Sequence, residues 1–549
     1  MSSEIRSAFD VYDAETIDRF KRDGWWHDVH SSELLAHHAA NRPDATAVVA
    51  GDDRITWSEL HDRVTGVATA LAGLGLEPGE CIGIQLPNSV DLVVSYLAAQ
   101  CAGLIPLTMM TIYREDDVIY MLGKCRARAY IYPSDSTGFD FATLAAKALD
   151  AVDSLEFVLP ARSASGERSV QSLAATPADH DALAAGRQGP DSVSRVGFTS
   201  GTTSRPKGVL HTHNTDLVTP FAMADEFGLD ENSTLWMPSP MAHVTGLLYG
   251  IYLPLVTGAK IVAQDKWDPR EALQLINKER VAFTVSATPF IVAMLQQTDL
   301  LESLDLSSFR YFVSGGARIP TAVVERAKER IGCDLLRVFG MSEGPICTLV
   351  RPDDDWAKHA STDGRPFAGA QVKVVDPEDR SRTLPHGEIG EYATRGPNRF
   401  LGYLHEPEQT AECTDAEGWF YSGDLVQTDS DDFVVYVDRM KDIVNRGGIK
   451  ISALEVENLL AAHEAIAAAA IIPVSDDRLG EIACAVVLLH AGETLTLEEI
   501  GRFLEERGVT KQKWPERLVI RAELPMTSTG KVQKNMLRAE LDPDWQVVA

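Results

Sequence analysis

Apolar runs that favour β-strands alternate along this chain with segments of helical period, and this alternation limits the fold more than any other feature. Strands separated by helices form parallel sheets whose faces the helices cover. An α/β protein with more than one mostly parallel sheet is therefore expected. The expected strands are 47–49, 81–86, 129–132, 260–263, 283–285 and 311–314, and the expected helices are 57–74, 90–101 and 269–278.

The pattern of expected strands and helices changes twice towards the C-terminal end of the chain. Short strands with Gly/Pro turns at 371–375 and 390–394 indicate a small β unit. After Lys441 the pattern becomes α+β, with a smaller C-terminal domain. We place two domains at 1–440 and 441–549, a number that fits 549 residues with 45% hydrophobic content. The expected elements of the second domain are helices at 454–463 and 496–507 and strands at 467–472 and 483–489; residues 163–194 are expected to form a surface connection.

Charge argues against a nucleic-acid partner. With 51 Lys and Arg against 80 Asp and Glu, the net charge is -29 and repels a polyanion. The segment 502–538 reverses this balance, with nine basic and four acidic residues. Such a basic patch suits a small phosphorylated ligand, and a solvated surface face is the alternative.

Cysteine usage and the N-terminus favour the cytoplasm. The seven cysteines are scattered and never occur in C-x-x-C spacing, so they indicate neither a disulfide framework nor a zinc site. The first 13 residues lack the apolar run of a signal peptide. The longest apolar stretch, 92–107, is interrupted by polar residues and Pro106, so no membrane span is expected.

A loop rich in hydroxyl groups and glycine carries the strongest chemical signal. Residues 199–208 read TSGTTSRPKG and follow the apolar run 196–198. Glycines let backbone N–H groups approach phosphate oxygens, hydroxyl groups add donors, and Lys207 adds charge. Pro206 and Gly208 flank the lysine where a Walker A loop needs Gly and Ser or Thr, so an ordinary P-loop NTPase is disfavoured.

Four further motifs follow this loop in a fixed order. They are 339–343 (FGMSE), 421–424 (YSGD), 438–448 (DRMKDIVNRGG) and 525–531 (PMTSTGK). Together with the loop, they resemble the adenylate-forming (AMP-binding) superfamily, which includes acyl- and aryl-CoA synthetases, peptide-synthetase adenylation domains and beetle luciferases. The acyl/aryl-CoA synthetase branch, with its cyclohexanecarboxylate and aromatic-acid ligases, is the most similar. The sequence departs from the family pattern at Ser204, Arg205, Phe339 and Ser422, and none of these removes a required functional group.

The resemblance implies two half-reactions at one site. A carboxylate attacks the α-phosphorus of ATP, pyrophosphate leaves, and the acyl group then moves to a thiol, so catalysis rests on positioning and charge neutralisation. The cofactors implied are ATP, Mg2+ and coenzyme A. Catalytic roles are implied for Lys531, Ser342, Glu343 and His243, with Ser342 donating to the α-phosphate and Glu343 holding Mg2+.

Nucleotide binding is assigned by the same resemblance. Asp424 would accept from the ribose hydroxyls and Arg439 would support the ribose and phosphates. Gly315, Gly316 and Ala317 would form a shelf for adenine. The full set implied for ATP and AMP is Thr199, Ser200, Gly201, Thr202, Thr203, Lys207, Gly315, Gly316, Ala317, Phe339, Gly340, Met341, Ser342, Asp424 and Arg439.

Domain rotation is the second implication. Lys441 falls at the family's hinge position, so the mobile C-terminal domain would withdraw Lys531 after adenylation and present Gly447 and Gly448 to the pantetheine thiol. The acid itself is expected to be bulky and alicyclic, aromatic or terpenoid, although a long-chain fatty acid stays open. The implied acyl pocket consists of Phe221, His243, Val244, Ser314, Gly315, Met341 and Pro345.

Alternatives differ in the acceptor and in the chemistry. A stand-alone acyl-AMP ligase would load a carrier protein in place of CoA. A luciferase-like oxygenase would consume oxygen, and a non-catalytic module would fail ATP–pyrophosphate exchange. A homodimer is left open. His211 and His213 form an H-x-H pair without neighbouring Cys or carboxylate partners in the sequence, which argues against a metal site there.

Overall fold

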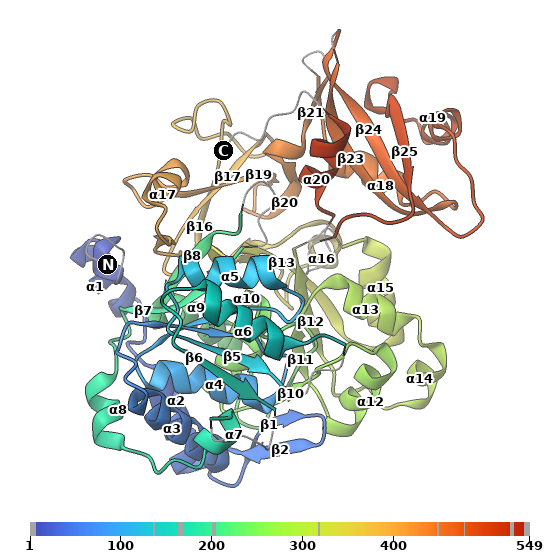
Figure 1. Ribbon diagram of the computed structural model, residues 1–549. Coiled ribbons are helices and arrows are strands. Elements are labelled where there is room, and N and C mark those ends of the chain that lie inside the picture. Colours follow the sequence, from blue (N-terminus) through green and yellow to red (C-terminus); the bar gives the residue numbers. More distant parts are fainter. Residues whose placement is uncertain are drawn as a thin grey trace. The chain divides into compact units, whose positions relative to one another are not determined.

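The computed structural model divides into two compact units, which are described one at a time (Figure 1). Unit 1 comprises 1–199, 208–372 and 394–420, and unit 2 comprises 200–207, 373–393 and 421–549. The residues that the structure describes are 7–134, 138–162, 168–199, 205–316, 319–446, 449–476, 478–526 and 532–542.

Unit 1 contains a nine-stranded sheet in the order β15-β14-β13-β12-β11-β9-β10-β1-β2. Its interior pairs, from β13 to β1, are parallel, and the antiparallel pairs lie towards the edges. The strands are β1 (Thr46–Ala50), β2 (Asp53–Thr56), β9 (Thr234–Met237), β10 (Lys260–Ala263), β11 (Phe283–Val285), β12 (Tyr311–Gly315), β13 (Asp334–Met341), β14 (Gly344–Leu349) and β15 (Arg365–Pro366).

The second sheet of unit 1 has seven strands in the order β18-β8-β7-β4-β3-β5-β6. Pairing is parallel from β7 to β6 and antiparallel between β7, β8 and β18. These two sheets confirm the expected α/β class with mostly parallel sheets. The strands are β3 (Cys81–Ile84), β4 (Ile105–Thr108), β5 (Ala129–Pro133), β6 (Phe157–Ala161), β7 (Val193–Phe198), β8 (Gly208–Thr212) and β18 (Gly402–Tyr403).

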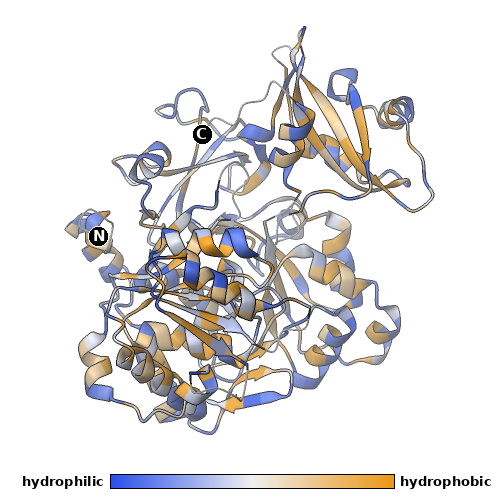
Figure 2. Cartoon of the chain, in the orientation of Figure 1, coloured by the Kyte–Doolittle hydropathy of each residue, from blue (hydrophilic) through white to orange (hydrophobic). Residues whose placement is uncertain are grey.

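Helices cover these sheets, and their ends follow local chemistry. Thr56 and Glu59 form a capping box at the start of α3, and Asp268 caps α12 just before Pro269. Apolar residues concentrate in the strands, which are mostly orange in Figure 2, and on the inner faces of the helices. The main helices are α1 (Ala14–Arg22), α2 (Ser31–Asn41), α3 (Trp57–Gly73), α4 (Val90–Cys101), α5 (Glu115–Lys124), α6 (Phe141–Ala151), α9 (His213–Phe227), α12 (Pro269–Glu279), α13 (Thr288–Leu295) and α15 (Thr321–Arg330).

The surface connection expected at 163–194 is only partly correct. The structure has two short helices there, α7 (Val170–Leu173) and α8 (His180–Gly186), and β7 begins at Val193. Ser169 caps α7 through its hydroxyl group, and the side chains of Val170 and Leu173 are buried. A helix of one turn presents too few residues for a period to be visible, which explains why the pattern was missed.

Unit 2 holds most of two further sheets, in which β19 pairs antiparallel with β20, and β21 pairs antiparallel with β22 and β24. The small β unit expected near 371–375 and 390–394 is a four-stranded sheet, β16-β17-β19-β20, and β25 joins the strands β22-β21-β24-β23 of the other sheet. The strands are β16 (Gln371–Val375), β17 (Ile389–Arg395), β19 (Phe420–Thr428), β20 (Val434–Arg439), β21 (Val444–Arg446), β22 (Ile449–Ile451), β23 (Ile466–Asp476), β24 (Gly480–Leu489) and β25 (Arg517–Arg521), and the helices are α18 (Ala453–Leu460), α19 (Leu497–Glu506) and α20 (Lys534–Leu541).

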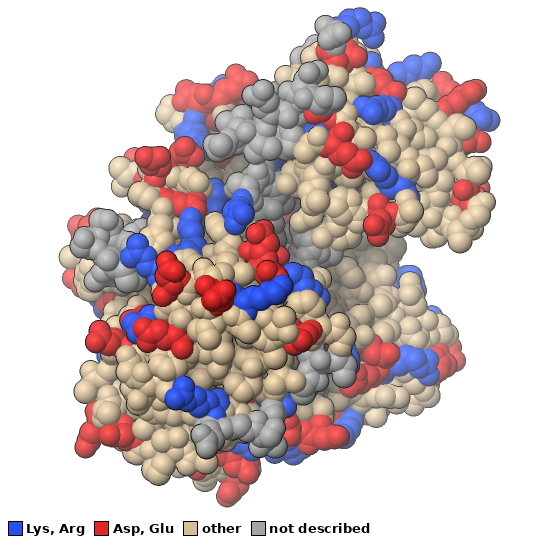
Figure 3. All heavy atoms as spheres, in the orientation of Figure 1, with Lys and Arg blue, Asp and Glu red and all other residues tan. Residues whose placement is uncertain are grey.

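Four of the nine basic residues in the segment 502–538 form ion pairs within unit 2. Lys513 pairs with Glu455, and Arg538 pairs with Glu481, both at 2.7 Å or less. Arg521 and Lys534 are likewise paired, with Glu540 and Glu457. On the visible face, blue and red side chains are interspersed (Figure 3). Much of the predicted positive excess is therefore neutralised by acidic residues outside the segment.

Among the helices that the structure describes, none is long and apolar enough to cross a membrane.

Candidate functional site

The phosphate-binding loop predicted at 199–208 joins two paired strands. β7 ends at Phe198 and β8 begins at Gly208, and these two residues are register partners in an antiparallel ladder. The expected strand before the loop is thus confirmed, and the ladder holds both ends of the loop. Thr199 and Lys207 are half-buried. Ser200, Gly201, Thr202 and Thr203 lie outside the described residues.

The motif 339–343 forms the tip of a β-hairpin. β13 ends at Met341, a turn follows at Ser342 and Glu343, and β14 begins at Gly344. A β-carbon at Gly340 would lie 2.3 Å from the backbone nitrogen of Ile346, so the hairpin requires glycine at that position.

A histidine on the strand after the phosphate loop contacts this turn. His211, in β8, is fully buried, and its Nε2 lies 2.8 Å from the carbonyl oxygen of Ser342. Burial, and then the charge of Arg195, lower the pKa of His211 to about 4. The ring is therefore neutral near pH 7, and Nε2 donates to the Ser342 carbonyl. This bond ties the strand that leaves the loop to the serine–glutamate turn.

Glu343 is held by two contacts. Its Oε1 accepts from the Tyr403 hydroxyl group at 2.7 Å, and its carbonyl oxygen accepts from the Phe400 N–H at 2.8 Å. The side chain is half-buried. A carboxylate in this position supplies the hard oxygen that Mg2+ prefers, so the residue fits the metal that the motif implies.

The small residues at 314–316 have a structural reason as well as the predicted adenine role. A β-carbon at Gly315 would lie 2.4 Å from the Val338 carbonyl oxygen, and Gly316 has a φ of +81°. The Ser314 hydroxyl is buried and lies 3.1 Å from that of Thr288. Ala317 lies outside the described residues.

In unit 2, Asp424 and Arg439 face each other across β19 and β20. They are register partners, and Arg439 Nε lies 3.2 Å from Asp424 Oδ1. The turn before Asp424 is fixed by Glu391, whose Oε1 accepts from the Gly423 N–H at 3.1 Å. Glu391 is fully buried and ion-paired with Arg380, and the sequence motif gave no signal for it.

The end of β20 also carries a structural aspartate. Asp438 Oδ2 accepts from the Ser452 hydroxyl at 2.6 Å and from the Leu454 N–H at 3.0 Å. It thereby fixes the start of α18, which Ser452 caps by accepting from the Glu455 N–H. The predicted hinge residue Lys441 lies in the short 3-10 helix η3 (Met440–Asp442). Gly447, Gly448 and Lys531 lie outside the described residues.

A cavity in unit 1 brings part of the predicted acyl pocket together. It spans about 410 Å³ including its open mouth. Of the seven pocket residues predicted, His243 and Val244 belong to its described lining, next to the catalytic candidate Ser342. The lining residues are Thr108, Met110, Tyr113, Arg195, Gly197, Phe198, Ala242, His243, Val244, Leu247 and Ser342.

The other predicted pocket residues make different contacts. Phe221, on α9, stacks on the His27 ring with centroids 3.7 Å apart. Met341 packs against a small apolar cluster that contains Phe400 and Tyr403. The Pro345 carbonyl accepts from Asn398 at 2.8 Å. The described cavity lining therefore supports only part of the predicted pocket and adds residues that the motifs did not indicate, Arg195 above all.

Comparison with known protein families decides the identity of the site. The model of the AMP-binding enzyme family matches residues 35–404, and that of the AMP-binding enzyme C-terminal domain matches residues 455–531. The chain belongs to the AMP-binding enzyme family. The resemblance found in the five motifs is thus confirmed.

Relatives of this AMP-binding enzyme include CoA ligases. It is 35% identical to the medium-chain fatty-acid–CoA ligase of Escherichia coli strain K12, over 95% of this chain and 92% of the relative. It is 32% identical to a salicylyl-CoA synthase / salicylate adenylyltransferase of a Streptomyces species, over 97% of each. The ATP-bound structure of MatB from Rhodopseudomonas palustris superposes with a TM-score of 0.82 at 27% identity, covering 94% of this chain and 100% of MatB.

The family assignment establishes the enzyme class. The AMP-binding enzyme is an ATP-dependent, AMP-forming acid–thiol ligase, and it uses ATP, Mg2+ and coenzyme A. The family and its relatives support acyl- or aryl-CoA ligase activity without defining the acid. The mixed α/β fold with a C-terminal domain matches that of the adenylate-forming enzymes.

Proposed function

We propose that the AMP-binding enzyme adenylates a bulky ring-bearing carboxylic acid and passes the acyl group to coenzyme A in the cytoplasm. The observation that carries the proposal is the hydrogen bond between His211 and the Ser342 carbonyl. It joins the strand that follows the phosphate loop to the serine–glutamate turn, and the same Ser342 lines the cavity with His243. The strand that follows the predicted phosphate loop and the lining of the cavity thus meet at Ser342.

Each motif then takes a role in adenylation. Ser342 donates to the α-phosphate, and His243 contacts the acid substrate beside its reacting carboxylate. Asp424, paired with Arg439, accepts from the ribose hydroxyls. Mg2+, when bound by Glu343, neutralises charge on the phosphates. Lys531 bridges the carboxylate and the α-phosphate, and rotation at Lys441 then brings Gly447 and Gly448 to the pantetheine thiol.

A ring acid is supported by the residue types in the lining. Phe198, Tyr113, Val244 and Leu247 supply aromatic and branched apolar surface to the cavity. The relative from Streptomyces is named for salicylate, a ring acid, whereas the one from Escherichia coli is named for a medium-chain fatty acid. The chain carries both similarities at nearly equal identity, and the aromatic lining of the cavity favours the ring acid.

A pyrophosphate-release screen over a panel of carboxylic acids tests the proposal. We expect release with alicyclic or aromatic acids and a thioester only when CoA is added. Pyrophosphate release with long fatty acids but with none of the ring acids contradicts the proposed substrate class. Adenylate that hydroxylamine traps but CoA does not consume, together with transfer to a holo-carrier protein, supports the carrier-loading alternative.

A further inference from the structure

A buried arginine forms part of the cavity wall. Arg195, on β7, is only 2% exposed, and it lines the cavity together with Gly197, His243 and Ser342. Burying a guanidinium costs free energy unless it is paired and hydrogen-bonded. The reason for keeping a cation at this position therefore lies either in the fold or in the ligand that the cavity receives.

Asp216 holds two of the three guanidinium nitrogens. Its Oδ2 accepts from Arg195 Nε at 2.7 Å and its Oδ1 accepts from Nη2 at 2.6 Å. Asp216 lies on α9 and is fully buried. Bidentate pairing of this kind fixes the plane of the guanidinium, and so it also fixes the direction of the third nitrogen, Nη1.

The third nitrogen faces the space beside Gly197. A β-carbon at position 197 would lie 2.8 Å from Nη1, and among the described residues, chain neighbours aside, it would have no other heavy atom within 4 Å. Gly197 is itself part of the cavity lining. No hydrogen bond engages Nη1 within the described part of the chain. The absent side chain at position 197 thus leaves a donor open towards the cavity.

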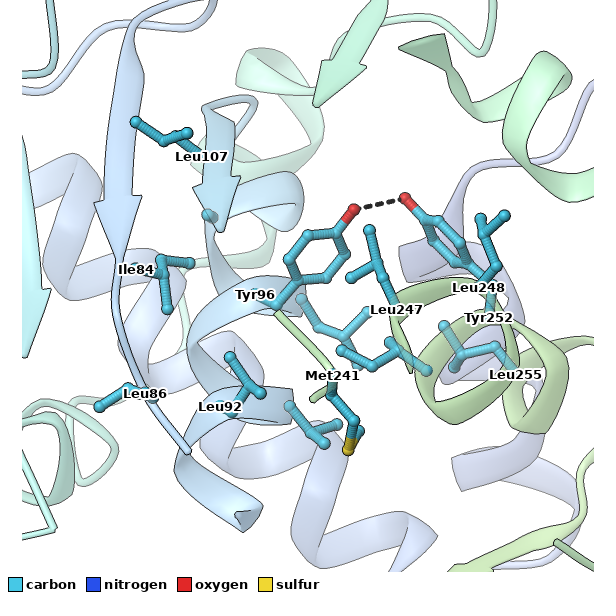
Figure 4. Packing of buried hydrophobic residues seen from close by; sticks show 14 of the residues in the cluster. Ile84, Leu86, Leu92, Tyr96, Leu107, Met241, Leu247, Leu248, Tyr252 and Leu255 are labelled. Carbon is cyan, nitrogen blue, oxygen red and sulfur yellow. Dashed lines mark hydrogen bonds between the residues drawn. The ribbon is translucent and has the colours of Figure 1, made fainter. Parts of the chain in front are cut away.

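The surroundings of the ion pair select a neutral partner for Nη1. Arg195 and Asp216 cancel each other's charge, and His211 beside them is neutral near pH 7, with a pKa lowered to about 4 by burial and by Arg195. Tyr96 and Tyr252, whose hydroxyl oxygens lie 2.8 Å apart, interact electrostatically with the pair and are also uncharged, because burial raises the pKa of each (Figure 4). A second carboxylate would add an unmatched buried charge, whereas a ketone or hydroxyl oxygen would not.

We propose that Arg195 is a specificity-determining residue whose Nη1 donates to a ketone or hydroxyl oxygen on the ring of the acid substrate. The assignment rests on the proposed function and narrows it to oxygen-bearing ring acids. Ser342 and His243 receive the carboxylate end of the acid, and Arg195 binds the oxygen elsewhere on the ring. A plain ring would bury Nη1 without an acceptor, and this penalty disfavours it.

Matched acids and a glycine variant test the assignment. The acids are 4-oxocyclohexanecarboxylate against cyclohexanecarboxylate, and 4-hydroxybenzoate against benzoate, with kcat/KM for pyrophosphate release as the readout. We expect the wild type to prefer one or both oxygen-bearing acids by about tenfold to a hundredfold, the range for a hydrogen bond to a charged donor. Gly197→Ala places a methyl group against Nη1 and should reduce that ratio to about threefold or less.

The control keeps Arg195 and Gly197 but changes the cavity. Leu247→Val removes one methylene from the lining, so it should alter both members of a pair alike and leave the ratio unchanged. A wild-type ratio near one for both pairs, or a ratio that Gly197→Ala leaves unchanged, overturns the assignment. If none of the acids gives pyrophosphate release, the proposed function itself is contradicted, and the assignment falls with it.

A second variant separates recognition from folding. Arg195→Met combined with Asp216→Leu removes both charges together, because removing one alone would leave a buried charge without its partner. Thermal unfolding first establishes that the double variant is folded. A folded variant that has lost the preference supports the assignment, and one that keeps it contradicts the assignment. Where the variant does not fold, the ratio measured for Gly197→Ala decides.

Discussion

The hydroxyl group of Tyr403 donates a 2.7 Å hydrogen bond to Oε1 of Glu343, although 60 residues separate the two in the chain. β18 places the tyrosine there because Tyr403 pairs with Val209 on β8, the strand that follows the phosphate loop. Burial, and then the negative charge of Glu343, raise the pKa of Tyr403, so its hydroxyl stays protonated and remains a donor. The carboxylate proposed to hold Mg2+ is therefore oriented by a residue outside the motif.

Tyr403→Phe should weaken the use of Mg2+ without abolishing activity. The substitution keeps the ring and removes the donor that orients Glu343, and loss of such supporting bonds typically weakens metal binding about 10-fold to 100-fold. We expect a rise of that size in the Mg2+ concentration that gives half-maximal pyrophosphate release. Tyr12→Phe is the control, since the Tyr12 hydroxyl donates to the Arg399 carbonyl. An unchanged Mg2+ requirement in Tyr403→Phe would contradict the proposed role.

Helices and strands could be predicted wherever a segment was long enough for its apolar residues to show a helical or strand period. The expected helix at 90–101 and strands at 260–263 and 283–285 coincide with α4, β10 and β11. The sequence could not indicate α7, which is a single turn held by the Ser169 cap and two buried side chains. Sheet order was also beyond reach, because it depends on pairings between distant segments, such as β1 with β10.

The candidate site was predictable where one motif carries the chemistry and missed where two distant segments share it. The hairpin tip at Ser342 and Glu343 came from a contiguous pattern. Arg195 offered one weak signal, a charge inside an apolar strand, and its partner Asp216 lies 21 residues later on a helix. Nothing local to either residue shows that they meet.

Asp424→Asn should raise the KM for ATP. The amide keeps the shape of the side chain but replaces one acceptor oxygen with a donor, and it loses the charge that pairs with Arg439 at 3.2 Å. One or two lost hydrogen bonds to ribose correspond to a rise of about 10-fold to 100-fold, with a smaller change in kcat. Steady-state ATP titration at saturating acid measures both.

A neighbouring aspartate provides the matched control for Asp424. Asp438 is also buried in the same sheet, but its carboxylate binds Ser452 and the start of α18. Asp438→Asn should therefore lower the thermal stability and leave the KM for ATP close to that of the wild type. The ribose assignment fails if Asp424→Asn changes stability alone.

His211→Gln should flatten the acid dependence of stability. The pKa of His211 falls from its ordinary 6.5 to about 4 in the folded state. A base with a lowered folded-state pKa takes up protons first in the unfolded chain, so stability falls as pH drops through 6.5 and the loss is complete near pH 4. Between about pH 7.5 and pH 4 the wild type should lose about 3 kcal/mol more unfolding free energy than the variant.

Urea unfolding across this pH range measures the difference. Other buried histidines contribute equally to the wild type and the variant and cancel in the comparison. His37→Gln, at an exposed position of α2, is the control and should follow the wild-type curve. Parallel curves for the wild type and His211→Gln would show that the ring does not stay neutral in the folded protein.

Lys531→Ala should separate the two half-reactions. Lys531 is proposed to neutralise the approaching carboxylate and α-phosphate, which repel each other only in adenylation, so pyrophosphate release should fall by at least about 100-fold. Thioester formation from a supplied acyl-adenylate should stay within about threefold of the wild type, because rotation withdraws Lys531 before the thiol attacks. Lys511→Ala, at a lysine of unit 2 that is exposed, should spare both steps. Equal loss of both half-reactions in Lys531→Ala would contradict rotation, since a lysine fixed in one place would serve both.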